Sequence, residues 1–263
     1  MRTTSNPAFR NLPTGGYGNN YAGFGQPPQQ AGPGYDPAPP SAANRPMTID
    51  DVVTKTGVTL AVLLVAGTIT FSMELYGLAL PAMIIGFVLA LVNIFKKVPS
   101  PALVLAYAVA EGVFLGAVSG IVGRAFSNGN AIVIQAIIGT IGVFIGMLVV
   151  YKTGAVKVTP KLTKWITGAV IGVAVLMLAN LVAGFITPGG LGLRDGGTIA
   201  IIFSLVCIGI AAFSFLLDFD AADEAIRAGV PSVFAWRIAF GLTVTLVWLY
   251  LEILRLLSYF NSD

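Results

Sequence analysis

Seven long apolar stretches, separated by short polar or helix-breaking segments, dominate the sequence after about residue 56. They span residues 56–73, 77–95, 101–123, 131–151, 165–186, 198–222 and 235–257. An α-helix of about 20 apolar residues crosses a hydrocarbon core of about 30 Å. Membrane strands would need alternating stretches of about ten residues, and the sequence has none. The pattern predicts an all-α integral membrane protein, a bundle of seven transmembrane helices.

The chain before residue 47 has a different composition. Residues 1–46 are rich in Pro, Gly, Gln, Asn and Ala and hold nine of the 15 prolines. Such a segment cannot bury enough apolar surface to offset the entropy cost of ordering, and it lacks the apolar core of a secretory signal. We expect a disordered cytoplasmic tail over 1–46 and a membrane domain over 47–263. Thr48, followed three residues later by Asp51, predicts a capping box where the first helix begins.

Composition narrows the classes of function. Hydrophobic residues make up 56% of the chain and charged residues only 10%, against about 25% charged residues in soluble domains. Histidine is absent and Cys207 is the one cysteine. This excludes a His-based catalytic triad, His-ligated haem, the common zinc sites and an internal disulfide. A net charge of +3 does not indicate nucleic-acid binding. We expect no enzyme activity and no cofactor.

The basic residues predict the orientation. If the amino terminus is cytoplasmic, twelve Lys and Arg residues fall inside and three outside, the bias expected for cytoplasmic loops. The inside set is Arg2, Arg10, Arg45, Lys55, Lys96, Lys97, Lys152, Lys157, Lys161, Lys164, Arg227 and Arg237. The outside set is Arg124, Arg194 and Arg255. The sequence alone assigns Arg124 and Arg194 no role beyond charges at the interface.

Small residues recur at the spacing typical of helix packing. Gly112, Gly116 and Gly120 form a stripe on the third predicted helix, and Gly142 and Gly146 are spaced in the same way on the fourth. Such stripes let two helix backbones approach closely. We expect both stripes to be packing surfaces.

Acidic residues inside the apolar stretches are the candidates for function, because a carboxylate at membrane depth costs about 2.5–3.5 kcal/mol on insertion scales. Glu111 lies near the middle of the third stretch, Asp218 toward the end of the sixth, and Glu252 in the seventh. Each also has an ordinary interpretation. Glu111 could be a protonated acid with a structural role, and Asp218 could end its helix among the lipid headgroups. Glu252 could form an i,i+3 ion pair with Arg255 near the outer interface.

A run of further acids follows Asp218. Asp220, Asp223 and Glu224 are typical of a solvated interfacial run. Asp220 is also a candidate, with Glu111, for an acidic residue that lines the interior.

If the Asp218 and Glu252 side chains were in contact, they could serve as a pH-sensitive pair. Two adjacent carboxyls cannot both ionise cheaply, so they would share a proton. Loss of that proton would push the helices apart or expose a cation site, and hard cations such as Ca²⁺ prefer oxygen ligands. The pair is therefore a candidate pH sensor and a candidate Ca²⁺ site.

The register of the last hairpin opposes this pairing. A turn near Pro231 would place a residue near 244 opposite Asp218, about 12 Å short of Glu252. The two acids meet only if the connection is asymmetric, for example with part of 224–234 lying along the membrane surface.

The acid-bearing segments resemble a known family. Residues 217–222 (LDFDAA) and 249–257 (LYLEILRLL) look like the last two helices of the Bax-inhibitor family, the transmembrane Bax-inhibitor-motif proteins. The family typically has Asp where this chain has Glu252. The segment 47–53 (MTIDDVV), the tail and Glu111-Gly112 look like an actinobacterial branch of the family. The resemblance covers about residues 47–260.

The resemblance implies a seven-helix protein of the bacterial plasma membrane whose last helix is wrapped by the other six. It implies a pH-sensitive Ca²⁺ leak channel whose sensor is the pair Asp218 and Glu252, with Ca²⁺ as the transported ion. The partners would be the lipid bilayer, Ca²⁺ and protons. The resemblance leaves open which residue serves as the family's basic latch, and partners of the tail are unknown.

Two other classes of function stay open. A proton-coupled transporter of small solutes would use Glu111 as its proton-binding site. A non-transporting scaffold would bind partners through its tail. A retinal protein is excluded because residues 235–257 contain no lysine, and an intramembrane Ser–His protease because there is no histidine.

Overall fold

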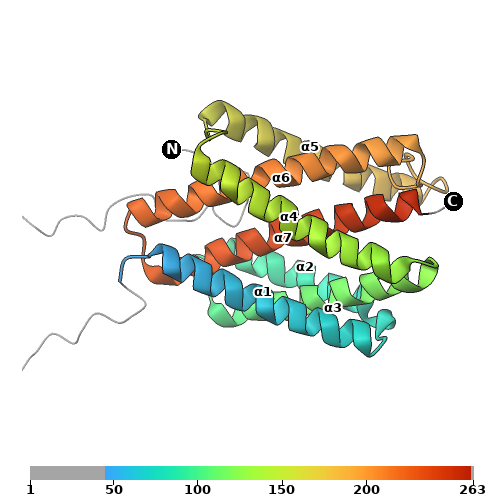
Figure 1. The fold of residues 1–263 in the computed structure, drawn as a ribbon, viewed down its shortest axis with the longest axis horizontal. Coiled ribbons are helices and arrows are strands. Elements are labelled where there is room, and N and C mark those ends of the chain that lie inside the picture. Colours follow the sequence, from blue (N-terminus) through green and yellow to red (C-terminus); the bar gives the residue numbers. More distant parts are fainter. Residues whose placement is uncertain (1–44, 262–263) are drawn as a thin grey trace, which may run out of the picture.

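The computed structural model describes residues 45–261, and within them the chain is helical, with no strand. The expected tail, residues 1–44, lies outside the described residues. Seven long helices follow one another (Figure 1), and all seven are long and apolar enough to span a membrane. They are α1 (Ile49–Ser72), α2 (Ala79–Phe95), α3 (Pro101–Ala125), α4 (Gly129–Thr153), α5 (Pro160–Gly184), α6 (Thr198–Arg227) and α7 (Ala235–Phe260). Short 3₁₀ helices over Tyr76–Leu78 and Ser232–Phe234 precede α2 and α7.

The predicted all-α, seven-helix fold is confirmed, and the helices extend past the apolar stretches. α1 begins at Ile49, directly after the predicted capping box, in which Thr48 and Asp51 hydrogen-bond each other's backbone. α5 begins with Pro160, and the Thr159 side chain caps it by accepting from the Leu162 amide. α6 continues as a helix to Arg227. Residues 224–227, which the sequence left open as part of the connection to the last helix, are therefore the final turn of α6.

The glycine stripe of α3 is a packing surface, as predicted. A β-carbon on Gly112 would lie 2.3 Å from the Leu63 carbonyl oxygen of α1, and one on Gly116 would lie 2.3 Å from the Gly67 carbonyl oxygen. Gly120 is covered by the Tyr76 ring. The close approach of the α1 and α3 backbones therefore depends on these glycines.

The second predicted stripe does not pack in this way. Gly142 and Gly146 of α4 are exposed, and nothing lies within 4 Å of a β-carbon built on either. The expectation that they bring two helices together is wrong, because the face of α4 that carries them points away from the bundle.

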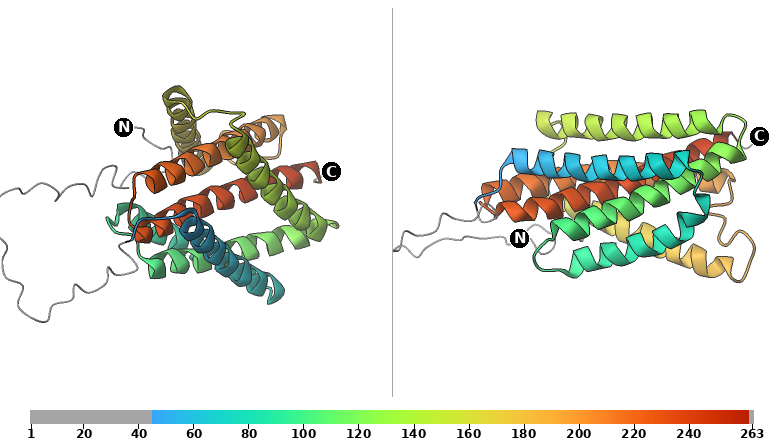
Figure 2. Two further views of the ribbon diagram at one scale, coloured as in Figure 1. Left: turned by 60° about the vertical axis from the view of Figure 1, so that its left-hand side comes forward. Right: turned by 90° about the horizontal axis from the view of Figure 1, so that it is seen from below.

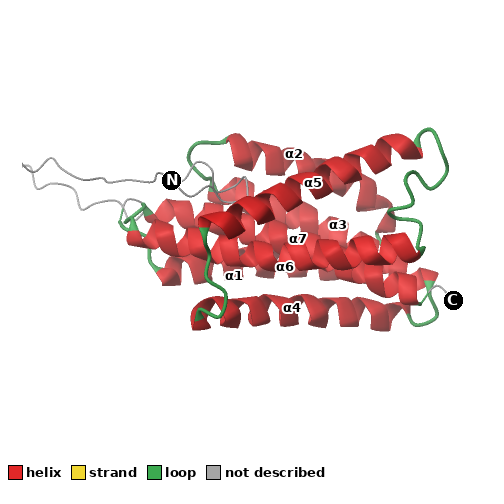
Figure 3. Ribbon diagram, turned by 90° about the horizontal axis from the view of Figure 1, so that it is seen from above, coloured by secondary structure: helices red, strands yellow, loops and turns green. Residues whose placement is uncertain are grey.

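α7 packs against four other helices, α1, α3, α4 and α6. α2 lies against α3, and α5 lies against α6 (Figures 2 and 3). A position of α7 wrapped by all six other helices stays a prediction.

The bundle has two ends, which are named here for the chain termini nearest to them. The amino end holds the start of α1 and the α6–α7 turn, and the carboxyl end holds the α5–α6 loop and the end of α7 (Figure 1). Large apolar side chains are exposed along the outer faces of the helices between these ends, for example Phe87, Ile138 and Leu178. Such a surface suits contact with lipid.

Candidate functional site

Asp218 lies between α6 and α7. It has no solvent-exposed surface, and it follows Leu216 and Leu217, which are also buried. The Thr245 hydroxyl of α7 donates a hydrogen bond of 2.7 Å to the Asp218 Oδ2 atom. The same hydroxyl lies 3.3 Å from the Gly241 carbonyl oxygen. The hairpin register predicted a residue near 244 opposite Asp218, and the structure places Thr245 there.

Glu252 lies nearer the carboxyl end of α7 and is 1% exposed. Its Oε1 atom accepts from Arg194 Nη2 at 2.9 Å and from Arg255 Nη1 at 3.1 Å. The pair with Arg255 is the i,i+3 contact that the sequence allowed. Arg194 comes from the α5–α6 loop, 58 residues earlier.

The partner Arg194 was missed by sequence reasoning, which treated it only as an interface charge. Its guanidinium also contacts the Met177 sulfur at 2.8 Å and lies 5.8 Å from the centre of the Phe203 ring. The loop that carries Arg194 is thus attached to α5, α6 and α7. The available signal was a lone arginine in a glycine-rich loop just before a helix that contains buried acids.

The two candidate sensor acids lie at different levels. Thr245, the partner of Asp218, is seven residues before Glu252 on α7, which corresponds to about 10 Å along the helix. The structure therefore brings Asp218 to Thr245, and Glu252 to Arg194 and Arg255. It does not bring the two acids to one level of α7. Their roles as a pH sensor and as Ca²⁺ ligands stay predictions.

Glu111 lies in the middle of α3 and faces α2. It is half-buried, and a β-carbon on Gly86 would lie 2.8 Å from its Oε1 atom. The Tyr107 side chain, one turn earlier on α3, interacts with the Glu111 carboxyl. Glu111 thus lies half-buried between α2 and α3, beside Tyr107, whose ring packs against Phe240 of α7.

Asp220 and the acids after it lie in the last part of α6, toward the amino end of the bundle. Asp220 is half-buried and within electrostatic range of Tyr151 on α4. The Tyr151 hydroxyl lies 3.3 Å from Asp223 Oδ2, and Asp223 forms an ion pair with Arg227. Glu224 is exposed. The paired and exposed acids agree with the predicted interfacial run, and the role of Asp220 in lining the interior stays a prediction.

Two further polar contacts fix α7 in the bundle. The Tyr250 hydroxyl and the Ser119 hydroxyl of α3 lie 2.6 Å apart. Arg237, near the start of α7, is 2% exposed and donates to the Lys96 and Lys97 carbonyl oxygens between α2 and α3. The sequence predicts Arg237 only as an inside charge, because a contact between α7 and the α2–α3 loop leaves no pattern in the sequence.

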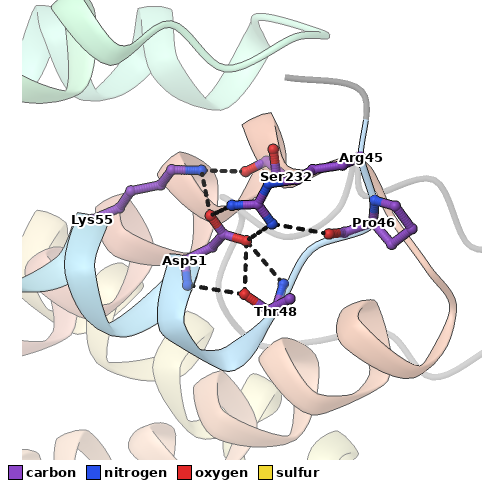
Figure 4. A network of polar contacts seen from close by, with 6 residues as sticks. All are labelled: Arg45, Pro46, Thr48, Asp51, Lys55 and Ser232. Carbon is purple, nitrogen blue, oxygen red and sulfur yellow. Dashed lines mark hydrogen bonds and ion pairs between the residues drawn. The ribbon is translucent and has the colours of Figure 1, made fainter. Parts of the chain in front are cut away.

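A network at the amino end ties the start of α1 to the α6–α7 turn (Figure 4). Asp51 accepts two hydrogen bonds from Arg45, at 2.7 and 2.8 Å, and lies 3.7 Å from Lys55 Nζ. Lys55 also donates to the Ser232 carbonyl oxygen. We call Arg45, Thr48, Asp51, Lys55 and Ser232 the amino-end clamp.

Backbone pairing reinforces the amino-end clamp. The Met47 amide donates to the Val230 carbonyl oxygen, and the Ser232 amide donates to the Arg45 carbonyl oxygen, both at 2.8 Å. Pro46 and Pro231 form an isolated β-bridge between these bonds. The residues just before α1 are therefore fixed to the hairpin that joins the two helices with the candidate sensor acids.

In the described part of the chain, no group of three or more Cys, Asp or Glu side chains is placed to hold a metal ion. Ca²⁺ coordination by Asp218 and Glu252 would thus involve carboxylates at separate positions, each with protein partners of its own.

The fold and these buried acids define a class, the multi-pass helical membrane proteins with ionisable groups between their last two helices. The family model described as Bax inhibitor 1 like matches residues 6–262, so the chain belongs to this family. This confirms the resemblance carried by residues 217–222 and 249–257. Among curated proteins, none matches the chain.

Proposed function

We propose that this protein is a proton-regulated leak channel that conducts Ca²⁺ across the bacterial plasma membrane, with its amino terminus in the cytoplasm. The observation that carries the proposal is the pair of buried carboxyl groups, Asp218 and Glu252, at the contacts of α7 with α6 and with the α5–α6 loop. A buried acid in a membrane domain is costly and commonly marks an ion or proton pathway. The proposal includes no catalytic reaction and no cofactor.

Glu252 and Arg194 supply the gating contact in this proposal. The ionised carboxylate holds Arg194, and with it the α5–α6 loop, against the carboxyl end of α7. Protonation removes the charge of Glu252 and weakens the ion pair, so Arg194 and its loop are released. Arg194 would thus serve as the basic latch that the family resemblance left open.

Asp218 supplies a second proton-sensitive position, at the level of Thr245. When ionised it places a negative charge between α6 and α7, where a carboxylate attracts a hard cation. We assign Glu111 and Asp220 to the acidic lining of the interior in the same way. The two candidate sensor acids act at successive levels in this mechanism, without sharing one proton.

Calcium flux from liposomes that contain the purified protein, recorded from pH 6 to pH 8, tests the proposal. We expect flux to rise as the pH falls, because protonation of Glu252 releases Arg194. Glu252→Gln should give the same flux at every pH, close to the acidic value of the parent protein. Glu224→Gln changes an exposed acid on α6 and serves as the matched control. Folded protein without flux at any pH would contradict the channel and favour a scaffold.

A proton-coupled transporter of small solutes is the second candidate function. Its supporting observation is Glu111, which is half-buried at mid-depth beside Tyr107 and against Gly86. A transporter would move its solute only along a proton or solute gradient and would lose coupling in Glu111→Gln. A channel would conduct Ca²⁺ down its own gradient with or without a proton gradient.

A further inference from the structure

Several buried polar atoms of the described residues form no hydrogen bond within the protein, and four of them gather around Glu252. They are Arg194 Nη1, Ser204 Oγ, Glu252 Oε2 and Tyr259 Oη. We call these four residues the carboxyl-end polar cluster. Buried polar groups without a partner are costly and uncommon. Four of them in one place therefore indicate a site for a polar molecule.

The cluster draws on three parts of the chain. Arg194 comes from the α5–α6 loop, Ser204 from α6, and Glu252 and Tyr259 from α7. The Ser204 side chain lies beside the Glu252 carboxyl, and it has no exposed surface. Tyr259 lies within electrostatic range of both Arg194 and Glu252.

The helical register explains how Tyr259 reaches Glu252. The two residues are seven positions apart on α7, so they lie on one face, two turns apart. Long side chains on a helix point back toward its amino terminus. The Tyr259 hydroxyl is therefore directed from the carboxyl end of α7 toward the Glu252 carboxyl. The ring packs near Gly196, where a β-carbon would lie 3.6 Å from Cδ1.

The hydrogen-bonding capacity of the four atoms identifies the class of ligand. The arginine nitrogen can only donate, the ionised carboxylate oxygen can only accept, and the two hydroxyls can do either. The positive charges of the two arginines beside Glu252 would repel a cation, and the carboxylate would repel an anion. Water both donates and accepts, and a buried water molecule typically has two to four polar partners.

We propose that the carboxyl-end polar cluster is an internal water site that carries protons between Glu252 and the carboxyl end of the bundle. The path runs from bulk water past Tyr259 and Ser204 to Glu252 Oε2. In the predicted orientation, Glu252 then senses the pH outside the cell. The inference rests on the proposed function, because it takes Glu252 as the group that binds the proton.

The ionisable and charged groups that face Glu252 are few. Arg194 comes from the α5–α6 loop, Cys207 from α6, and Arg255 and Tyr259 from α7, while Asp195 of the loop lies near Tyr259. The residues of α1, α3 and α4 that pack against this part of α7 include Leu63, Leu115 and Ala136, which are apolar. Proton exchange at Glu252 therefore depends on the carboxyl-end polar cluster and its arginine partners.

Infrared spectroscopy on the full-length protein in lipid nanodiscs tests the proposal without measuring flux. A protonated carboxyl has a C=O band that disappears when it ionises, and the band that Glu252→Gln removes belongs to Glu252. We expect Ser204→Ala and Tyr259→Phe to shift the titration midpoint of this band and to slow its exchange in D₂O several-fold. Ser214→Ala on α6 and Tyr250→Phe on α7 are matched controls, because both hydroxyls have hydrogen-bond partners elsewhere.

Two results would overturn the water site. One is a Glu252 band with unchanged midpoint and exchange rate in both Ser204→Ala and Tyr259→Phe. The other is the absence of any Glu252 band between pH 5 and pH 8, which would show that Glu252 takes up no proton in this range. A different pair of results would contradict the channel proposal alone. In that case the infrared changes would appear as expected, but the liposomes would show no Ca²⁺ flux.

Discussion

Arg194 in the α5–α6 loop forms a buried ion pair with Glu252 of α7, with 2.9 Å between Nη2 and Oε1. The contact joins the longest loop at the carboxyl end to the last helix. It also leaves the Oε2 oxygen of the same carboxylate without a hydrogen bond. One oxygen of the Glu252 carboxylate is thus bound to arginine, and the other is buried without a hydrogen bond.

The ion pair gives a first prediction about stability. Removing one partner of a buried pair typically costs about 3–5 kcal/mol, because the other charge stays buried without compensation. Arg255 remains beside Glu252, so we expect Arg194→Gln to cost less, about 1–3 kcal/mol. The double variant Arg194→Gln with Glu252→Gln should be more stable than the sum of the single effects implies. Thermal unfolding in detergent measures the coupling, and strict additivity would show that the contact is unimportant.

Asp218 gives a prediction about pH dependence. Asp218→Asn keeps an oxygen opposite Thr245 but cannot ionise, so we expect a flatter flux–pH profile and lower Ca²⁺ flux. Thr245→Val keeps the carboxyl and removes a hydrogen bond that favours its ionised form. Its flux–pH profile should therefore shift toward higher pH.

The matched control for Thr245→Val is Thr243→Val on the same helix. The Thr243 hydroxyl is buried and donates only to the Ala239 carbonyl oxygen at 2.8 Å. Its flux–pH profile should match that of the parent protein. An unchanged profile in Asp218→Asn would count strongly against Asp218 as a sensor.

Replacing a glycine by alanine should affect stability differently in α3 and in α4. Gly116→Ala places a β-carbon 2.3 Å from the Gly67 carbonyl oxygen, so α1 and α3 must move apart and the melting temperature should fall. Overpacking of this kind typically costs about 1–3 kcal/mol. Gly142→Ala meets nothing within 4 Å and should be neutral or stabilising by up to about 1 kcal/mol. Equal effects of the two substitutions would disprove the packing assignment.

The amino-end clamp gives a prediction about dynamics. Asp51→Asn removes the charge that holds Arg45 and Lys55 and weakens the capping box. We expect faster amide hydrogen exchange both at the start of α1 and in the α6–α7 turn, because the Met47 and Ser232 amides bond across the clamp. Hydrogen–deuterium exchange with mass spectrometry measures both segments. The neighbouring exposed acid Asp50 supplies the control, since Asp50→Asn should leave the turn unchanged.

The fold was largely predictable because membrane helices leave a strong and local signal. Length and hydropathy located all seven, and Thr48 with Asp51 marked the start of α1. The helix ends were less predictable. α6 runs on through Asp220, Asp223 and Arg227, since polar residues continue a helix beyond the apolar stretch whenever no breaker intervenes.

The candidate site was predictable only in part. Buried acids stand out in an apolar sequence, so Asp218, Glu252 and Glu111 were found. Arg194, the partner of Glu252, could not be predicted, because that contact depends on the path of a loop, whereas the position of Thr245 opposite Asp218 was predicted to within one residue. The near match between residue 244 and Thr245 shows that counting from the hairpin turn works where the connection is short. No comparable rule applied to the long α5–α6 loop.

The amino-end clamp makes the α6–α7 turn a fixed pivot. When two rigid helices are fastened at one end, any change in the angle between them produces a displacement that grows with distance from the fastening. Asp218, at the level of Thr245, lies partway along this lever, and Glu252 lies about 10 Å farther out. A small rotation would therefore move the Glu252 contact more than the Asp218 contact. The ion pair between Glu252 and Arg194 would break first, and the contact between Asp218 and Thr245 would open second.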